Sequence, residues 1–139
     1  MKQLIVLCAV FILLVVILLQ IPLEMVNYEK RHAVMFYVNN AKEMAKQEGY
    51  YTDEILELLK KNIAQKIKIS ESEVIISNNT TRVPKYRLNK FDEGEAIYLK
   101  ISVPFKNIIA ASNFMGITNN KGYYIIEIIT TSERLANGE

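Results

Sequence analysis

The chain has 139 residues, enough for one small domain with a tether, and 50% of them are apolar. Its 17 Lys and Arg residues nearly balance its 15 Asp and Glu residues, giving a net charge of +2. A nucleic-acid-binding surface normally has a clear basic excess, so we do not expect nucleic acid as the partner. The single cysteine, Cys8, excludes an intramolecular disulfide and a thiolate-rich zinc site.

An uninterrupted apolar run opens the chain. Leu4–Leu19 contains no charge, and the uncharged stretch extends through Gln20, Ile21 and Pro22 to Leu23, just before Glu24. As a helix, Leu4–Leu19 would span about 24 Å, and the extension to Leu23 reaches about 30 Å, the thickness of a hydrocarbon core. We therefore predict that residues 1–24 form an uncleaved transmembrane anchor.

Three other interpretations of the run compete with an anchor. A cleaved signal peptide has a short apolar region and small residues at its cleavage site, a pattern that Leu19–Leu23 lacks. A lipoprotein signal needs small residues before its cysteine, but the bulky Ile5-Val6-Leu7 precedes Cys8. A helix buried in a soluble domain is disfavoured, because the run is apolar on every side.

The charges that flank the run barely specify its orientation. Lys2 precedes it, while Lys30 and Arg31 on the other side are balanced by Glu24 and Glu29. The short segment before the run is typical of a signal-anchor. We therefore expect the rest of the chain, residues 25–139, to form a single extracytoplasmic domain at the cell membrane.

A helical pattern continues directly from the anchor. Val34, Val38, Ala41 and Ala45 recur at helical spacing between polar residues, and Gly49 is a good stop signal. We expect one rod, apolar at its base and amphipathic above it.

A second, shorter helix is predicted after Gly49. Thr52 is a plausible N-cap, and Asp53 and Glu54 would lie in the first turn, where the helix dipole favours acidic groups. The apolar stripe of this helix is expected to contain Ile55, Leu58, Leu59, Ile63 and Ile67.

Beyond the second helix the apolar period changes to two, which is typical of strands. The clearest strand is 95–105, where apolar residues alternate with Tyr98, Lys100 and Ser102. Pro84 makes the segment 81–88 an edge strand at best, because proline cannot donate to a ladder. The strands are expected at 74–76, 81–88, 95–105 and 122–134, with a turn at Asn78-Asn79.

The segment 106–121 between the last two strands is expected to be a short helix or a packed loop, because it contains Ile108, Ile109, Phe114, Met115 and Ile117. Two helices followed by an antiparallel meander of about three to four strands predict an α+β fold. The expected core members are Val38, Ala41, Leu58, Leu59, Leu99, Ile101, Val103, Ile126 and Ile128.

The sequence offers little chemistry. His32 is the only histidine, and a polar residue on a membrane-proximal helical turn explains it better than a metal ligand or a catalytic base. Asp92, Glu93 and Glu95 surround Gly94 without the spacing of a calcium loop, so we interpret them as a solvated turn.

Catalysis has no visible basis either. Asn78-Asn79-Thr80-Thr81 contains two glycosylation-type triplets, which a turn explains equally well. With no nucleophile elbow and no phosphate-binding loop, we expect a protein that is not an enzyme. No catalytic, cofactor-binding or metal-binding residue is assigned.

The tyrosines are candidates for protein contacts. Tyrosine is favoured at interfaces because its ring is apolar while its hydroxyl can stay wet. Ordinary strand packing is the better explanation for each one taken singly. The candidates are Tyr50, Tyr51, Tyr98, Tyr123 and Tyr124.

The layout of the chain resembles a known family. An apolar helix continues into an amphipathic one ending around Val38–Gly49, a second short helix follows, and the last strand contains Ile126–Arg134. This order is similar to that of the small pilin-like proteins of the TadE type, minor pilins of bacterial tight-adherence and secretion systems. The resemblance covers nearly the whole chain. It consists in the order and type of the helices and strands, not in an invariant sequence motif.

One feature of type IV pilins is not present. Their prepilin peptidase site has a small residue before the apolar run and a glutamate five residues beyond the cut, whereas here the run begins at Leu4 and the first acid is Glu24. The resemblance therefore implies an unprocessed, membrane-resident component.

The implied partners are other pilin-like subunits or a membrane assembly platform. A membrane-anchored extracytoplasmic binding or sensing module, unrelated to fibres, is the alternative function. Co-purification with an assembly ATPase and a platform protein would favour the first function, and a discrete ligand would favour the second.

Overall fold

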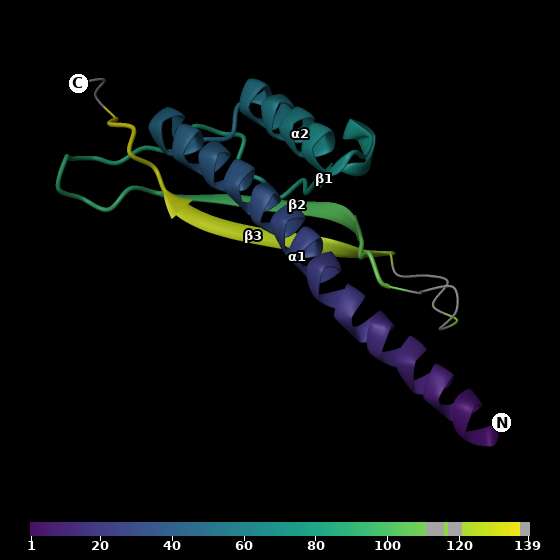
Figure 1. Ribbon diagram of the computed structural model, residues 1–139. Helices are drawn as coiled ribbons and strands as arrows, with labels where there is room; N and C mark the ends of the chain where they lie inside the picture. The colour runs from purple at the N-terminus through teal and green to yellow at the C-terminus, as the bar shows by residue number, and fades with distance from the viewer. Residues whose placement is uncertain (111–115, 117–120, 137–139) are drawn as a thin grey trace.

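The computed structural model describes residues 1–110, 116 and 121–136. Its elements are two helices, α1 (Lys2–Glu48) and α2 (Asp53–Ile67), a 3-10 turn, η1 (Glu71–Glu73), and strands β1 (Ile75–Ile76), β2 (Ala96–Lys106) and β3 (Lys121–Thr131). The strands form one antiparallel sheet in the order β1-β2-β3. Both helices lie on one side of this sheet, and the N-terminal part of α1 projects far beyond it (Figure 1). The expected α+β class is confirmed.

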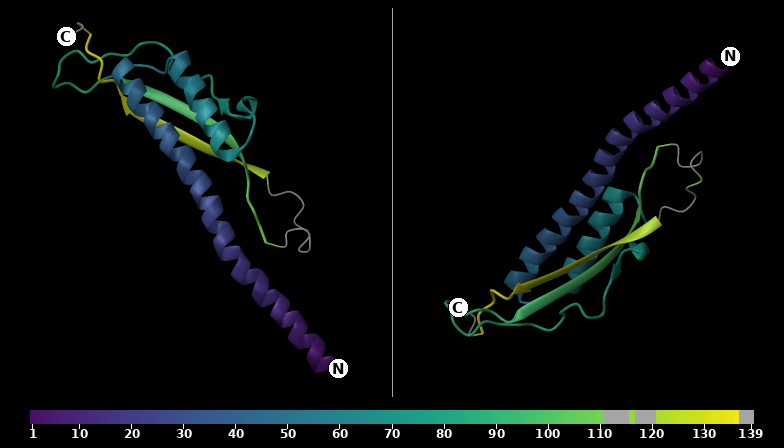
Figure 2. Two further views of the ribbon diagram at one scale, coloured as in Figure 1. Left: turned by 45° about the horizontal axis from the view of Figure 1, so that its top comes forward. Right: turned by 90° about the horizontal axis from the view of Figure 1, so that it is seen from below.

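Helix α1 is continuous, and its C-terminal half packs on the domain. Val34, Val38, Ala41 and Ala45 are buried in the hydrophobic core. Pro22 lies inside the helix, where it removes a backbone donor, and the helix bends as it leaves the domain (Figure 2).

Gly49 ends α1 as the sequence predicts. It adopts the left-handed conformation, with φ of 84°, and its N–H donates to the carbonyl of Ala45 at 2.8 Å. The Lys85 N–H donates to the Gly49 carbonyl at 3.0 Å, and a Cβ at position 49 would collide with the Lys85 carbonyl oxygen. Glycine is therefore required here for both conformation and space.

The C-terminal segment satisfies the last carbonyls of α1. The Glu133 N–H donates to the Lys46 carbonyl at 2.9 Å, and the Arg134 side chain donates to the Glu48 carbonyl at 2.9 Å. The carboxylate of Glu133 also pairs with the Lys46 ammonium at 2.8 Å. This cap fixes the end of α1 to the chain that leaves β3.

Helix α2 begins as expected. Thr52 is its N-cap and accepts a hydrogen bond from the Ile55 N–H at 3.2 Å. One expected core member is wrong, because Leu58 is 46% exposed and Leu56 is buried instead. The buried side of α2 consists of Ile55, Leu56, Leu59, Ile63 and Ala64.

Strand β2 is the centre of the sheet, and its side chains alternate as predicted. Ile97, Leu99, Ile101, Val103 and Phe105 are buried beneath the helices, while the residues between them are half-buried. Ile126 on β3 is also buried, and Ile128 is half-buried against the same core. The predicted register of β2 is therefore confirmed.

The expected strand at 81–88 is wrong. Its backbone donors bond in turn to different parts of the molecule: Thr81 to the Tyr98 carbonyl, Lys85 to that of Gly49 and Arg87 to that of Arg134. Pro84 has no donor to contribute. Within the described part of the chain the sheet consequently has three strands, and β3 ends at Thr131 rather than continuing to Arg134.

The turn at Asn78-Asn79 is confirmed. In the expected helix or loop at 106–121, Phe114, Met115 and Ile117 lie outside the described residues.

Candidate functional site

Large apolar side chains lie exposed on the outer side of α1, from the end of the apolar run to the start of the packed half of the helix. We call this set the outer stripe. Its members, with their exposed fractions, are Ile21 (61%), Met25 (64%), Tyr28 (68%), Met35 (39%) and Phe36 (55%).

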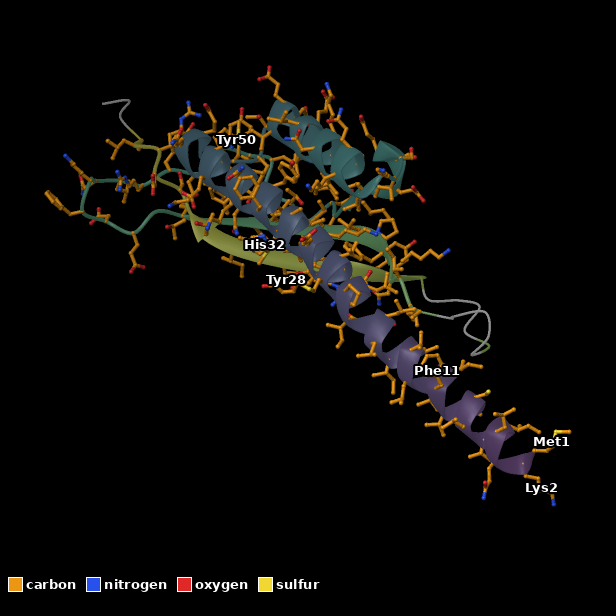
Figure 3. All side chains as sticks on the ribbon, viewed as in Figure 1. Met1, Lys2, Phe11, Tyr28, His32 and Tyr50 are labelled. Atoms are coloured by element: carbon orange, nitrogen blue, oxygen red, sulfur yellow. The ribbon has the colours of Figure 1, made fainter. Side chains whose placement is uncertain are left out.

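The outer stripe points away from the domain. An α-helix turns by about 100° per residue, so Phe36 lies roughly 200° from the buried Val34. Figure 3 shows Tyr28 and His32 on this part of α1. The exposed His32 ring lies 6.1 Å from the Tyr28 ring, centroid to centroid. The stripe continues the apolar surface of the run onto a length of helix that also carries polar residues.

Two hollows border the outer stripe. One lies between the stripe and the end of α2, and its lining includes Tyr28, His32, Phe36 and Lys66. The other lies along the lower part of the stripe, and its lining includes Ile21, Met25 and Tyr28. Tyr28 lines both hollows.

On the opposite side of α1, polar side chains bind the chain that follows β2. The Asn27 side chain donates to the Ile108 carbonyl at 3.0 Å and accepts from the Ile108 N–H at 2.9 Å. Lower on the helix, the Gln20 side-chain oxygen accepts from the Ala110 N–H at 2.9 Å. Arg31 donates to the Asn107 side chain at 3.0 Å. We call Gln20 and Asn27 the clamp.

The clamp was not expected from the sequence. Asn27 and Ile108 are 81 positions apart in the chain, and Gln20 and Ala110 are 90 positions apart. No local sequence pattern predicts such contacts. The one available signal was polarity, because Gln20 interrupts the end of an apolar run. Asn27 is 1% exposed, and a buried amide of this kind requires hydrogen-bond partners.

The acidic residues near Gly94 do not form a single site. Asp92 accepts a hydrogen bond from the Asn89 side chain at 2.9 Å, while Glu95 pairs with Lys85 at 3.2 Å. Within the described ranges, no group of three or more His, Cys, Asp or Glu side chains could hold a metal ion.

The tyrosine candidates lie in different environments. Tyr51 is 1% exposed and belongs to the core, where burial, and to a lesser degree the nearby Glu43 charge, raises the pKa of its hydroxyl. Tyr123 is 65% exposed, and Tyr50, Tyr98 and Tyr124 are half-buried. Tyr51 is therefore not a surface contact residue.

Helix α1 is long and apolar enough to cross a membrane, and its apolar window has no buried share. Comparisons of the chain with protein-family models, with curated proteins and with solved structures gave no significant match.

Proposed function

We propose that this protein is a membrane-anchored, non-enzymatic subunit of a bacterial surface assembly, of the pilin-like or minor-pilin type, that acts through protein contacts of α1. The anchor is the apolar run, and the domain lies outside the cytoplasm. One observation carries the proposal: a single helix leaves the domain with its apolar side chains largely exposed, and its apolar surface continues past Glu24 as the outer stripe.

Lipid alone accounts for only part of this exposed surface. If Glu24 marks the membrane exit, Met35 lies about 16 Å farther along the helix. The headgroup layer adds only about 5–7 Å on each side of the hydrocarbon core. Lipid headgroups can therefore reach Met25 and Tyr28, whereas Met35 and Phe36 lie beyond their reach, where a protein partner could cover them.

The architecture supports the pilin-like assignment over a simple tether. A tether needs only a span and a linker, whereas α1 is one continuous helical rod from Lys2 to Glu48, bent as it leaves the domain and capped by the C-terminal segment. Such a rod holds the domain at a fixed height and orientation above the membrane. This is a property that a subunit of an ordered assembly requires and a freely tethered module does not.

A cysteine scan tests the proposal. In a Cys8→Ala background, single cysteines are placed along Leu4–Val16 and at Met25, Tyr28 and Phe36, and membranes are treated with a bifunctional thiol crosslinker. We expect crosslinks to membrane proteins or to other copies on selected helix faces. If no position crosslinks, the subunit function fails and an anchored binding module becomes the better explanation.

The orientation has its own test. Asn79 is exposed, so Asn79→Cys in the Cys8→Ala background provides a single accessible thiol. A membrane-impermeant maleimide should label it in intact cells. Labelling that appears only after lysis would place the domain in the cytoplasm.

A further inference from the structure

The sheet has a second face, directed away from both helices, which we call the open face. Four apolar side chains on it are largely exposed: Ile75 on β1 (52%), and Tyr123 (65%), Ile125 (55%) and Ile129 (71%) on β3. The right-hand view of Figure 2 shows both helices on the other side of the sheet. The open face is therefore an apolar surface with no described helix over it.

On the open face, side chains of β2 and β3 lie beside one another in cross-strand pairs. Antiparallel pairing places Tyr98 beside Ile129, Ser102 beside Ile125 and Pro104 beside Tyr123. Near the middle of this pattern Lys100 pairs with Glu127, and the two side chains form a salt bridge. The face thus consists of two apolar ends separated by one ion pair.

We propose that the open face binds the open face of a second copy of this chain, giving a two-sheet sandwich with a two-fold axis parallel to the strands, between β2 and β3. This axis places β2 of one copy over β3 of the other. The lateral neighbours within one sheet then become the facing pairs between sheets. Tyr98 meets Ile129 of the second copy, and Lys100 meets Glu127.

Charge is the first reason for choosing a second copy as the partner. Under this axis, the two Lys100 ammonium groups and the two Glu127 carboxylates form a square in which every neighbour has the opposite sign. Each charge gains a second counter-ion as water leaves the interface, so the polar centre of the face is not left unpaired. A wholly apolar partner surface would offer these charges no such compensation.

The second reason is the direction of the axis, and this reason rests on the proposed membrane anchoring. Two copies anchored in the same orientation in one membrane can be related only by an axis along the membrane normal. Strands β2 and β3 run obliquely to α1 (Figure 1), so an axis parallel to them satisfies that condition when α1 is tilted in the membrane, as transmembrane helices commonly are. Both α1 helices then lie on the outside of the pair, and their outer stripes stay free for other partners.

The size of the face indicates a weak pair that needs the membrane. Two strands of this length present a rectangle of roughly 35 Å by 10 Å, so the pair buries on the order of 700 Å² in total. Stable interfaces usually exceed about 1,000 Å². Confinement of both copies to one membrane raises their effective concentration and compensates for the small area.

Charge reversal tests the pairing in full-length protein, in native membranes solubilised with a mild detergent. Lys100→Glu and Glu127→Lys should each reduce co-purification of two differently tagged copies by at least about tenfold, because four like charges meet. Mixing the two variants should restore it, since position 100 of each chain then faces an opposite charge at position 127 of the other chain. Lys61→Glu, on the exposed side of α2, is the control and should change nothing.

The mixture distinguishes a loss of pairing from a loss of folding. Each chain in the mixture still has like charges at its own positions 100 and 127, so mixing would not restore association if the variants were misfolded. Failure of the mixture to restore association overturns the inference, and so does the absence of association between wild-type copies. If association survives both reversals but is lost in Phe36→Glu, the copies meet through α1. The sandwich is then wrong while the proposed function stands.

A second measurement covers the case in which a reversed chain does not fold. In the Cys8→Ala background, one tagged copy carries Tyr98→Cys and the other carries Ile129→Cys. A short bifunctional thiol crosslinker should join the two tags, because facing sheets lie about 10 Å apart, too far for a direct disulfide but within the reach of the crosslinker. Leu58→Cys paired with Ile129→Cys should not be joined. Equal yields from the two pairs would contradict the sandwich.

Discussion

The two halves of α1 share one backbone geometry but lie in different surroundings. No residue before Asn27 is buried, whereas the half from Val34 onward places Val34, Val38, Ala41 and Ala45 in the core. A helix satisfies its own backbone hydrogen bonds, so it can continue beyond its domain without backbone penalties. The side chains alone decide which half packs on the sheet and which half is left exposed.

This difference indicates where binding surfaces should be sought. In the upper half, one side of α1 is occupied by the core and the other side becomes polar beyond Phe36, with Asn39 and Glu43. In the apolar run, Leu4–Leu19, every side is apolar. The outer stripe is the region in between, where an apolar surface continues above Glu24 although the domain does not cover it.

The largest expected effect comes from removing the support of the upper half. Leu99 is fully buried in the same core as Val34 and Val38, so Leu99→Ala should destabilise the domain by about 2–5 kcal/mol. Lys100→Ala, on the open face, should cost less than about 1 kcal/mol. Urea titration followed by pulse proteolysis in detergent micelles measures both.

The lower half provides the control for that experiment. Leu99→Ala should remain in the membrane fraction, because the apolar run does not depend on the core. Equal losses from Leu99→Ala and Lys100→Ala would contradict the assigned faces of β2, and loss of membrane association would contradict the independence of the two halves.

A smaller effect is expected at the boundary between the halves. Asn27→Ala leaves the N–H and the carbonyl of Ile108 without their side-chain partner, so we expect a loss of about 1–3 kcal/mol. Asn39→Ala, at an exposed position of the same helix, should be neutral or slightly stabilising. The same denaturation assay compares them, and similar values would mean that the clamp contributes little.

The smallest effect is expected at Tyr51, whose buried hydroxyl has no hydrogen-bond partner among the described residues. Tyr51→Phe removes the desolvated hydroxyl and keeps the ring, so stability should be unchanged or rise by up to about 1 kcal/mol. Tyr51→Ala, which also removes the ring, should cost several times more, about 3–5 kcal/mol. A clear loss in Tyr51→Phe would show that the hydroxyl is paired after all.

The sequence predicted those parts of the fold that have a strong local signal. The alternation of Ile97–Phe105 identified the faces of β2, and Thr52 and Gly49 marked a helix start and a helix end. These signals depend on residues close together in the chain, so they are readable without tertiary structure.

The errors come from tertiary contacts. Leu56 lies on the same side of α2 as Lys60, one turn away. Because of this charged neighbour, the sequence pattern did not identify Leu56 as a residue that packs against the core. The segment 81–88 has strand-like residues, but its donors find partners in α1, β2 and the C-terminal segment. The clamp at Gln20 and Asn27 depends on the return of the chain after β2, so no local pattern could identify it.

The central claim is that the outer stripe of α1 is covered by another protein, and site-specific photo-crosslinking tests it most directly. A photoreactive amino acid replaces Phe36 (55% exposed) in one variant and Leu58 (46% exposed), on α2, in a matched control. In cell membranes, the probe at position 36 should give discrete protein adducts and the probe at position 58 should give few. No protein adduct at position 36, or equal adducts at both positions, would contradict the account.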